Sequence, residues 1–238
     1  MRLGAMVKKW WLGLAVAGLA GVMVGAACGG SSELEGRKTV THTVAVAGAT
    51  DDGIINVSAD GVPYGQYIGT LYGGVTMIGT MTIDYSTCGA VQYNGANLQT
   101  RALYRFNISE WTEGDVTFTT QLLQVMSAGV GSLEVYVLQQ DCGALPAGDS
   151  TAADQSAVWN GGQLLTTVTP AAGEISAQIP AATVTECKSA EGYIAIMVKA
   201  TGETTPAASM LAPNAFTLST FEHATTAGTE LPHVEWTA

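Results

Sequence analysis

The chain has 238 residues, of which 12% are charged, and a formal net charge of −11 at pH 7. Three of its nine basic residues lie in the first 28 positions and all 20 acidic residues lie beyond them. The remainder therefore carries six basic residues against 20 acidic ones, a net charge of −14. This balance makes nucleic acid a poor partner, because binding it requires a clustered positive surface. Anionic polysaccharide is disfavoured for the same reason, unless a local basic patch attracts it.

The N-terminus has the pattern of a signal peptide over residues 1–28: a basic segment, then an uncharged run, then small residues before Cys28. Those small residues and the Gly-Gly-Ser-Ser that follows Cys28 resemble a bacterial lipobox and its tether, although Gly25 stands where an aliphatic residue is usual. The resemblance implies cleavage before Cys28 and lipidation of its thiol, which places the protein in the bacterial cell envelope. Two alternatives stay open. Ordinary cleavage would leave Cys28 a plain thiol in a secreted protein, and the uncharged run is nearly long enough to remain as a membrane anchor.

Residues 29–39 have the composition of a flexible tether, and 40–238 are predicted to form one domain because no Pro/Ser-rich linker interrupts them. Period-2 alternation and apolar runs between turn residues predict many short strands in this domain. The strands are expected over 40–47, 54–58, 75–85, 101–109, 116–126, 132–139, 164–168, 173–179, 193–199, 216–222 and 233–237. A Gly- and Tyr-rich loop is expected at 62–74, a polar excursion at 86–99 and at most a brief helix within 150–157. This spacing predicts an all-β antiparallel sandwich.

The segment 101–139 is predicted to be the centre of the fold. Its first strand alternates, with one face apolar and the other carrying Arg101, Arg105 and Asn107 toward water. Strand 193–199 is apolar on both faces and should be central. The expected core includes Tyr104, Phe106, Ile108, Val135, Ile194, Ile196 and Trp236.

Residues 101–109, Arg-Ala-Leu-Tyr-Arg-Phe-Asn-Ile-Ser, resemble the Arg-x-Leu-x-Arg-Phe-Asp-Leu-Ser strand of DNRLRE-type (disaggregatase-related) domains, which are classed with carbohydrate-binding modules. Similar short elements occur at 51–55, 64–65, 116–138, 216–223 and 231–236, so the resemblance covers most of 40–238. The long insertion at 75–100 and Asn107 in place of Asp are departures from the family pattern. The resemblance implies a jelly-roll-like β-sandwich on a secreted or surface protein and points weakly to glycan binding.

The cysteines beyond position 28 are Cys88, Cys142 and Cys187. Cys142 follows one predicted strand and Cys187 precedes another, so antiparallel neighbours would bring them to the same end of a sheet, and an oxidising compartment favours a Cys142–Cys187 disulfide. The alternative is that Cys88 takes one of those two partners. No C-x-x-C spacing favours zinc.

No catalytic constellation is visible. His42, His223 and His233 are the only histidines, and no G-x-S-x-G motif occurs. A metal site built from Glu222, His223 and His233 is weighed and set aside in favour of a solvated strand edge, so no metal and no cofactor are predicted. Asp51 and Asp52 could bind calcium, but a plain turn explains the pair more simply.

Aromatic residues are the better functional lead, because sugar rings stack on Tyr and Trp while polar neighbours bind the hydroxyls. The candidates are Tyr64, Tyr67 and Tyr72 in the Gly-rich loop, Trp111 and Trp159 in turns, Asn160 beside Trp159, and Arg101 and Arg105 as a fork for a uronate carboxylate. Two alternatives remain: the tryptophans cap the core, and the arginines pair with neighbouring glutamates.

The sequence thus predicts a non-catalytic, exported and lipid-anchored surface module that binds glycan and touches the membrane only through its lipid. A structural or adhesive surface protein that contacts another protein is the alternative, and a secreted glycan hydrolase or lyase is the third.

Overall fold

The computed structural model describes residues 39–48, 51–58, 85–93, 96–126, 131–139, 158–207, 209 and 212–238. The chain divides into two units, residues 1–38 and 39–238. The signal peptide, Cys28 and the tether up to residue 38 lie outside the described residues, as do the predicted loop at 62–74 and the brief helix at 150–157. No helix in the described part is long and apolar enough to span a membrane.

The described part of the domain is built from antiparallel strands with short helical segments. The strands are β1 (Thr41–Ala45), β2 (Asp52–Ser58), β3 (Tyr85–Tyr93), β4 (Ala96–Asn107), β5 (Val116–Val125), β6 (Leu133–Val137), β7 (Gln163–Val168), β8 (Gly173–Ile179), β9 (Tyr193–Ala200), β10 (Asn214–Ser219) and β11 (His233–Thr237). The helices are α2 (Ala181–Cys187) and α3 (Phe221–Ala227), and a further helical stretch covers 158–160. The predicted antiparallel β-sandwich is confirmed.

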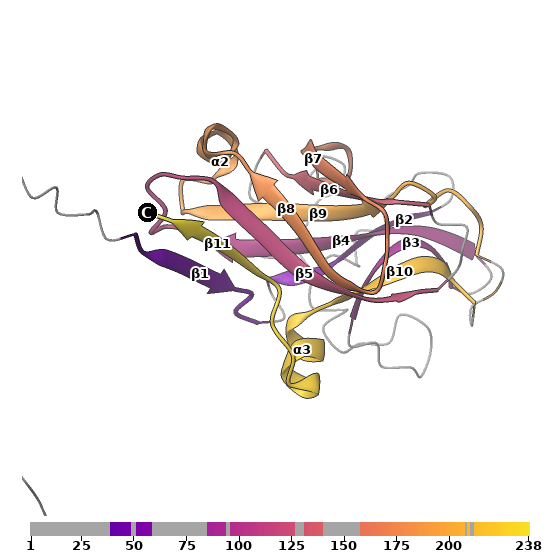
Figure 1. The fold of residues 1–238 in the computed structure, drawn as a ribbon. Helices are drawn as coiled ribbons and strands as arrows, with labels where there is room; N and C mark the ends of the chain where they lie inside the picture. The colour runs from indigo at the N-terminus through magenta and orange to yellow at the C-terminus, as the bar shows by residue number, and fades with distance from the viewer. Residues whose placement is uncertain are drawn as a thin grey trace, which may run out of the picture. The chain divides into compact units, whose positions relative to one another are not determined.

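The strands hydrogen-bond in the order β1-β11-β5-β10-β3-β4-β9-β6-β7, with β2 beside β4 and β8 beside β5. The ring of Phe118 on β5 packs against Tyr104 and Phe106 on β4, with centroids 5.3 and 5.9 Å apart. Because β4 and β5 do not hydrogen-bond to each other, these contacts join two layers face to face. In Figure 1 the β5–β8–β11 layer crosses in front of the β4–β9 layer. Strand β10 pairs with both β5 and β3 and so links the layers.

The predicted core lies between these layers. Tyr104, Phe106, Ile108, Val135, Ile194, Ile196 and Trp236 are each at most 2% exposed, as the alternation predicts. Strand β9 is buried on both faces over most of its length, as expected of a central strand.

A second apolar cluster covers the other face of β4 and corrects the expectation of a wet face there. Its buried members are Ile55, Leu103, Leu138, Ala195 and Met197, with Tyr136, Val158 and Trp159 packed against them. Leu103 is 0% exposed and Arg101 only 8%, although Asn107, at the end of the strand, is exposed as predicted. The face is therefore buried where it meets this cluster and open only at its end.

Some stretches differ from the sequence prediction because local helix and strand signals were missed. Residues 86–93, expected as a polar excursion, form most of β3, whose pairing with β4 and β10 buries Cys88. The strand expected over 216–222 ends at Ser219, because Thr220 caps α3 by accepting a hydrogen bond from His223 N at 3.2 Å. Gly228 then ends α3 with a left-handed φ of 66°.

The predicted Cys142–Cys187 disulfide is wrong, because Cys187 is a free thiol. Cys142 lies outside the described residues. The physical reason is α2: residues that belong to no predicted strand form a helix, and its last residue, Cys187, points into the core with 2% exposure. Cys88 is also free and fully buried. Burial raises the pKa of both thiols, which makes them poor nucleophiles in the folded protein.

Candidate functional site

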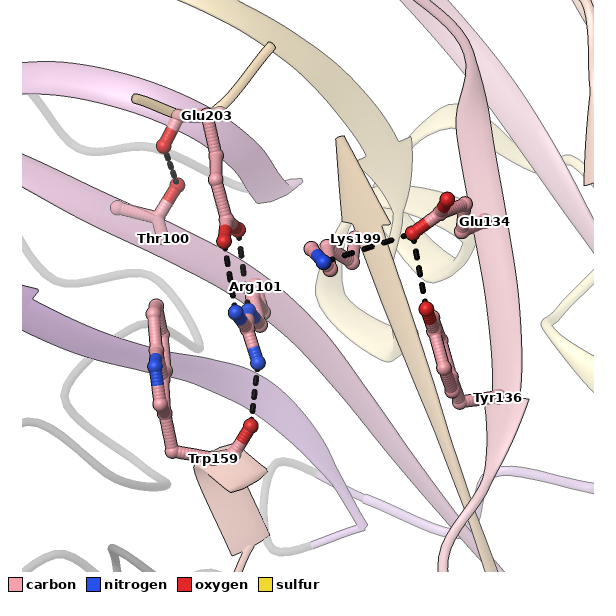
Figure 2. A network of polar contacts seen from close by, with 8 residues as sticks. Thr100, Arg101, Glu134, Tyr136, Trp159, Lys199 and Glu203 are labelled. Atoms are coloured by element: carbon pink, nitrogen blue, oxygen red, sulfur yellow. Dashed lines mark hydrogen bonds and ion pairs between the residues drawn. The ribbon is translucent and has the colours of Figure 1, made fainter. Parts of the chain in front are cut away.

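Arg101, one of the predicted site residues, is held by a buried ion pair with Glu203. Its Nε donates to Glu203 Oε2 at 3.0 Å and its Nη2 donates to Glu203 Oε1 at 2.6 Å, which makes a bidentate pair (Figure 2). Both side chains are less than 10% exposed. The hydrogen bonds of a bidentate arginine–carboxylate pair are charge-assisted and roughly twice as strong as neutral ones.

Trp159 completes this arrangement from the other side. The Arg101 guanidinium carbon lies 3.6 Å from the centroid of the Trp159 ring, and Arg101 Nη1 donates to the main-chain oxygen of Trp159. Figure 2 shows the indole ring beside the guanidinium and the Glu203 carboxylate above it. Arg101 and Trp159 thus contact each other. Because Glu203 already binds the Arg101 guanidinium on two nitrogens, that guanidinium is not free to bind the carboxylate of a uronate.

A smaller set of polar contacts lies beside that pair on the same layer. Tyr136 donates to Glu134 Oε2 at 2.9 Å, and Lys199 Nζ lies 3.5 Å from the same oxygen (Figure 2). Burial, and after it Glu134, raises the pKa of Tyr136. The charges on this stretch therefore compensate one another within the protein.

Arg105 and Trp111 are likewise engaged in the fold. The Arg105 guanidinium stacks 3.5 Å from the Tyr193 ring centroid, and its Nη1 lies 3.9 Å from Asp51 Oδ1. Trp111 belongs to the main core, is 7% exposed and donates from Nε1 to Gly114 O at 2.9 Å. Trp111 therefore caps the core, one of the two alternatives that the sequence left open.

The remaining candidates divide between the surface and the undescribed part of the chain. Asn160 is exposed next to Trp159. Tyr64, Tyr67 and Tyr72 lie outside the described residues, so their role as stacking platforms stays a prediction.

A shallow hollow of about 480 Å³ lies on the other layer, which sequence reasoning did not single out. We call it the polar groove. It is lined by Thr41, Asp115, Thr117, Gln178, Glu235, Trp236 and Thr237. These residues come from β1, β11, β5 and β8 and from the turn before β5.

The strand register explains how the groove is assembled. Thr43 of β1 lies opposite Glu235 of β11, which lies opposite Thr117 of β5, which in turn lies opposite Gln178 of β8. Side chains that lie opposite each other on neighbouring antiparallel strands project from the same face. One row of hydroxyl, carboxylate, hydroxyl and amide groups therefore crosses four strands. The only hint in the sequence was the alternation of Thr against apolar residues within each strand.

The two carboxylates of the groove differ in how they are bound. Asp115 accepts from Gln178 Nε2 at 3.0 Å and from Ala181 N at 2.9 Å, so both of its oxygens are used. No hydrogen bond or ion pair joins the Glu235 carboxylate to any residue that the structure describes. The groove thus presents one uncommitted carboxylate among neutral hydroxyls, and none of its described lining residues is basic.

The lining of the groove includes no Ser, Cys or His side chain that could form a Ser–His or Cys–His pair. What it can do is accept and donate hydrogen bonds over a flat polar surface. No protein-family model and no curated protein matches the chain. The likeness to DNRLRE-type domains therefore rests on its short motifs and stays a prediction.

Proposed function

We propose that this chain is a non-catalytic surface module that binds glycan, exported and tethered to the bacterial envelope by lipid on Cys28. Its domain is a β-sandwich of jelly-roll-like type, and the polar groove is its ligand site. The observation that carries the proposal is the row Glu235–Thr117–Gln178, which supplies carboxylate, hydroxyl and amide groups to the groove.

Sugar hydroxyls act as both donors and acceptors, and these side chains offer both kinds of partner. A groove with one free carboxylate and no basic lining residue favours neutral glycans over anionic ones, in agreement with the net charge of −14 beyond residue 28. Binding should be weak, because a few exposed hydrogen bonds leave little free energy after the costs of desolvation and ordering.

Glycan-array binding of the purified full chain, followed by calorimetry, tests this function. Glu235→Gln should weaken binding about 10- to 100-fold and Thr117→Val about fivefold, since a lost hydrogen bond to a charged group costs about 1.5–3 kcal/mol and a neutral one about 1 kcal/mol. Thr167→Val is the matched control, because Thr167 is an exposed strand threonine on β7 that does not line the groove.

Other outcomes would select another function. A blank array together with a specific protein partner, whose binding Glu235→Gln weakens, would favour an adhesive module. Release of reducing sugar or of unsaturated product by the purified chain would favour a hydrolase or lyase.

Export and lipidation have their own test. Cells labelled with a fatty-acid analogue should incorporate label into the wild-type chain and not into Cys28→Ser. An unlabelled wild type would mean that Cys28 carries no lipid.

A further inference from the structure

Strand β1 forms one edge of its layer, because β11 is its only partner among the described strands (Figure 1). Just before β1, Val40 N donates to Ala238 O at 3.1 Å and Ala238 N donates back to Val40 O at 3.0 Å. In an antiparallel ladder such hydrogen-bonded pairs alternate with residues whose N–H and C=O groups point the other way. Thr41, Thr43 and Ala45 therefore present their main-chain groups at an open edge, where no described residue hydrogen-bonds to them.

This edge lacks the features that usually protect the edge of a sheet. Charged side chains, proline and bulges discourage a further strand from pairing there. Strand β8, at the other edge of the same layer, carries the exposed Glu174. Strand β1 reads Thr-His-Thr-Val-Ala, without Asp, Glu, Lys, Arg or Pro, and it pairs with β11 without a bulge. Thr41 and Thr43 are both exposed, so the edge is open to another extended strand.

The outward residues are symmetric about Thr43, which favours a second copy of this chain as the partner. We propose that two copies pair through their β1 strands in antiparallel orientation, centred on Thr43. Thr43 then lies opposite Thr43 of the second copy, and Thr41 lies opposite Ala45. These three residue pairs each form two main-chain hydrogen bonds. Their side chains are small and uncharged, a cross-strand Thr–Thr pair is favourable, and the surface is its own complement, as a two-fold interface requires.

Val40 gives independent support for a partner at this edge. Its side chain is large, apolar and 49% exposed. It lies on the same face of the strand as Val44 and Val46, which pack in or against the core. In the centred register Val40 lies opposite Val46 of the second copy. The interface therefore removes apolar surface from water, which is favourable.

The contact is short, so the dimer should be weak. Stable interfaces bury about 1,200–2,000 Å² in total, and one edge strand with small side chains covers less than that. Each copy also carries a net charge of −14 beyond residue 28, and this repulsion is reduced by salt. Association should therefore be measured at physiological ionic strength, with a covalent trap for the paired state.

The pairing has a consequence for ligand binding. Side chains that lie opposite each other across strands project from the same face, so the polar grooves of both copies would open on one face of a continuous sheet. A glycan with repeating units could then contact both copies, and two linked weak sites give a higher avidity than one. This consequence rests on the proposed function, whereas the dimer itself does not.

Cysteine trapping in the full chain tests the register. At the central hydrogen-bonded pair the two Cα atoms should be about 5.5 Å apart, within the range of about 4.4–6.8 Å that a disulfide requires. Thr43→Cys should therefore give a disulfide-linked dimer under mild oxidation, above the background that the native cysteines give in the wild type. Thr41→Cys is the matched control, because this exposed residue lies on the same strand and face. Its two copies would be about 14 Å apart, too far to bridge.

Sedimentation of the full chain over a range of concentrations gives a second readout. The wild type and Thr43→Val, which keeps the main-chain donor, should both shift toward dimer as the concentration rises. Thr43→Pro should lose this shift, because proline removes the central N–H and is tolerated on an edge that faces solvent. If Thr43→Pro does not fold, the two cysteine variants still decide the question.

Three results would overturn the proposal: no disulfide-linked dimer of Thr43→Cys above the wild-type background, equal trapping of Thr41→Cys and Thr43→Cys, or a folded Thr43→Pro that dimerises like the wild type. The first would mean that the edge stays unpaired or meets a different partner, and the other two that copies meet elsewhere. None of these measurements involves a glycan, so their failure is distinct from a failure of glycan binding at the polar groove.

Discussion

Removing one partner of the Arg101–Glu203 pair should strongly destabilise the protein. Glu203→Leu would leave the Arg101 guanidinium buried, 8% exposed, with its charge uncompensated. Breaking a buried ion pair on one side costs about 3–5 kcal/mol. Since whole domains are stable by only about 5–15 kcal/mol, we expect a loss of roughly 6–20 °C in Tm for a domain of this size.

The double variant Arg101→Met/Glu203→Leu provides the sharper test. With both charges gone and the volume largely kept, it should be more stable than either single variant, because hydrophobic replacement of a whole buried pair is often neutral. Urea unfolding of the four proteins gives the coupling free energy directly. Lys199→Met is the control: the Lys199–Glu134 contact is 3.5 Å, with side chains 27% and 20% exposed, so its loss should cost about 0–1 kcal/mol. Single variants that lose less than about 1 kcal/mol, or losses that simply add in the double variant, would refute this reasoning.

Packing and backbone geometry lead to three more predictions. Phe106→Ala should cost about 3–5 kcal/mol in urea unfolding, because the ring is 1% exposed between the layers; a loss under about 1 kcal/mol would contradict its core role. Gly192→Ala should cost more than Gly228→Ala, since both have positive φ but only the new Cβ at Gly192 would meet main-chain atoms of Ser109 at 2.8 Å; equal losses would contradict this. Cys88 and Cys187 should react with iodoacetamide only after unfolding, and a disulfide found at either residue by non-reducing peptide mapping would contradict the free thiols.

The alternation within single strands was enough to predict the core. Tyr104 and Phe106 recur every second residue in β4, and each is buried, because the side chains of a strand alternate between its two faces. The same rule failed for Arg101, since its face of β4 is covered by a cluster drawn from other strands and from the short helical stretch at 158–160. Its partner Glu203 is 102 positions away, a separation that no local pattern reports.

The short helices were missed for a related reason. Residues 181–187, Ala-Ala-Thr-Val-Thr-Glu-Cys, hold β-branched residues and no side-chain N-cap, which are weak helix signals. The helix is supported instead from outside: Asp115, in the turn before β5, accepts the hydrogen bond of Ala181 N. Its apolar side then buries Val184 and Cys187 in the core, so tertiary contacts override the local preference.

The two layers of the sandwich differ in what they leave for a ligand. On the β4–β9 layer, Arg101, Glu203 and Trp159 satisfy one another, so a ligand that used them would have to break contacts that stabilise the fold. On the β5–β11 layer, the Glu235 carboxylate lies beside Thr117 with no partner among the described residues, so a ligand could bind it without that cost. Binding free energy is the surplus left after such costs. Of the two polar surfaces that the structure describes, the groove around Glu235 is therefore the one where a weakly bound glycan is expected.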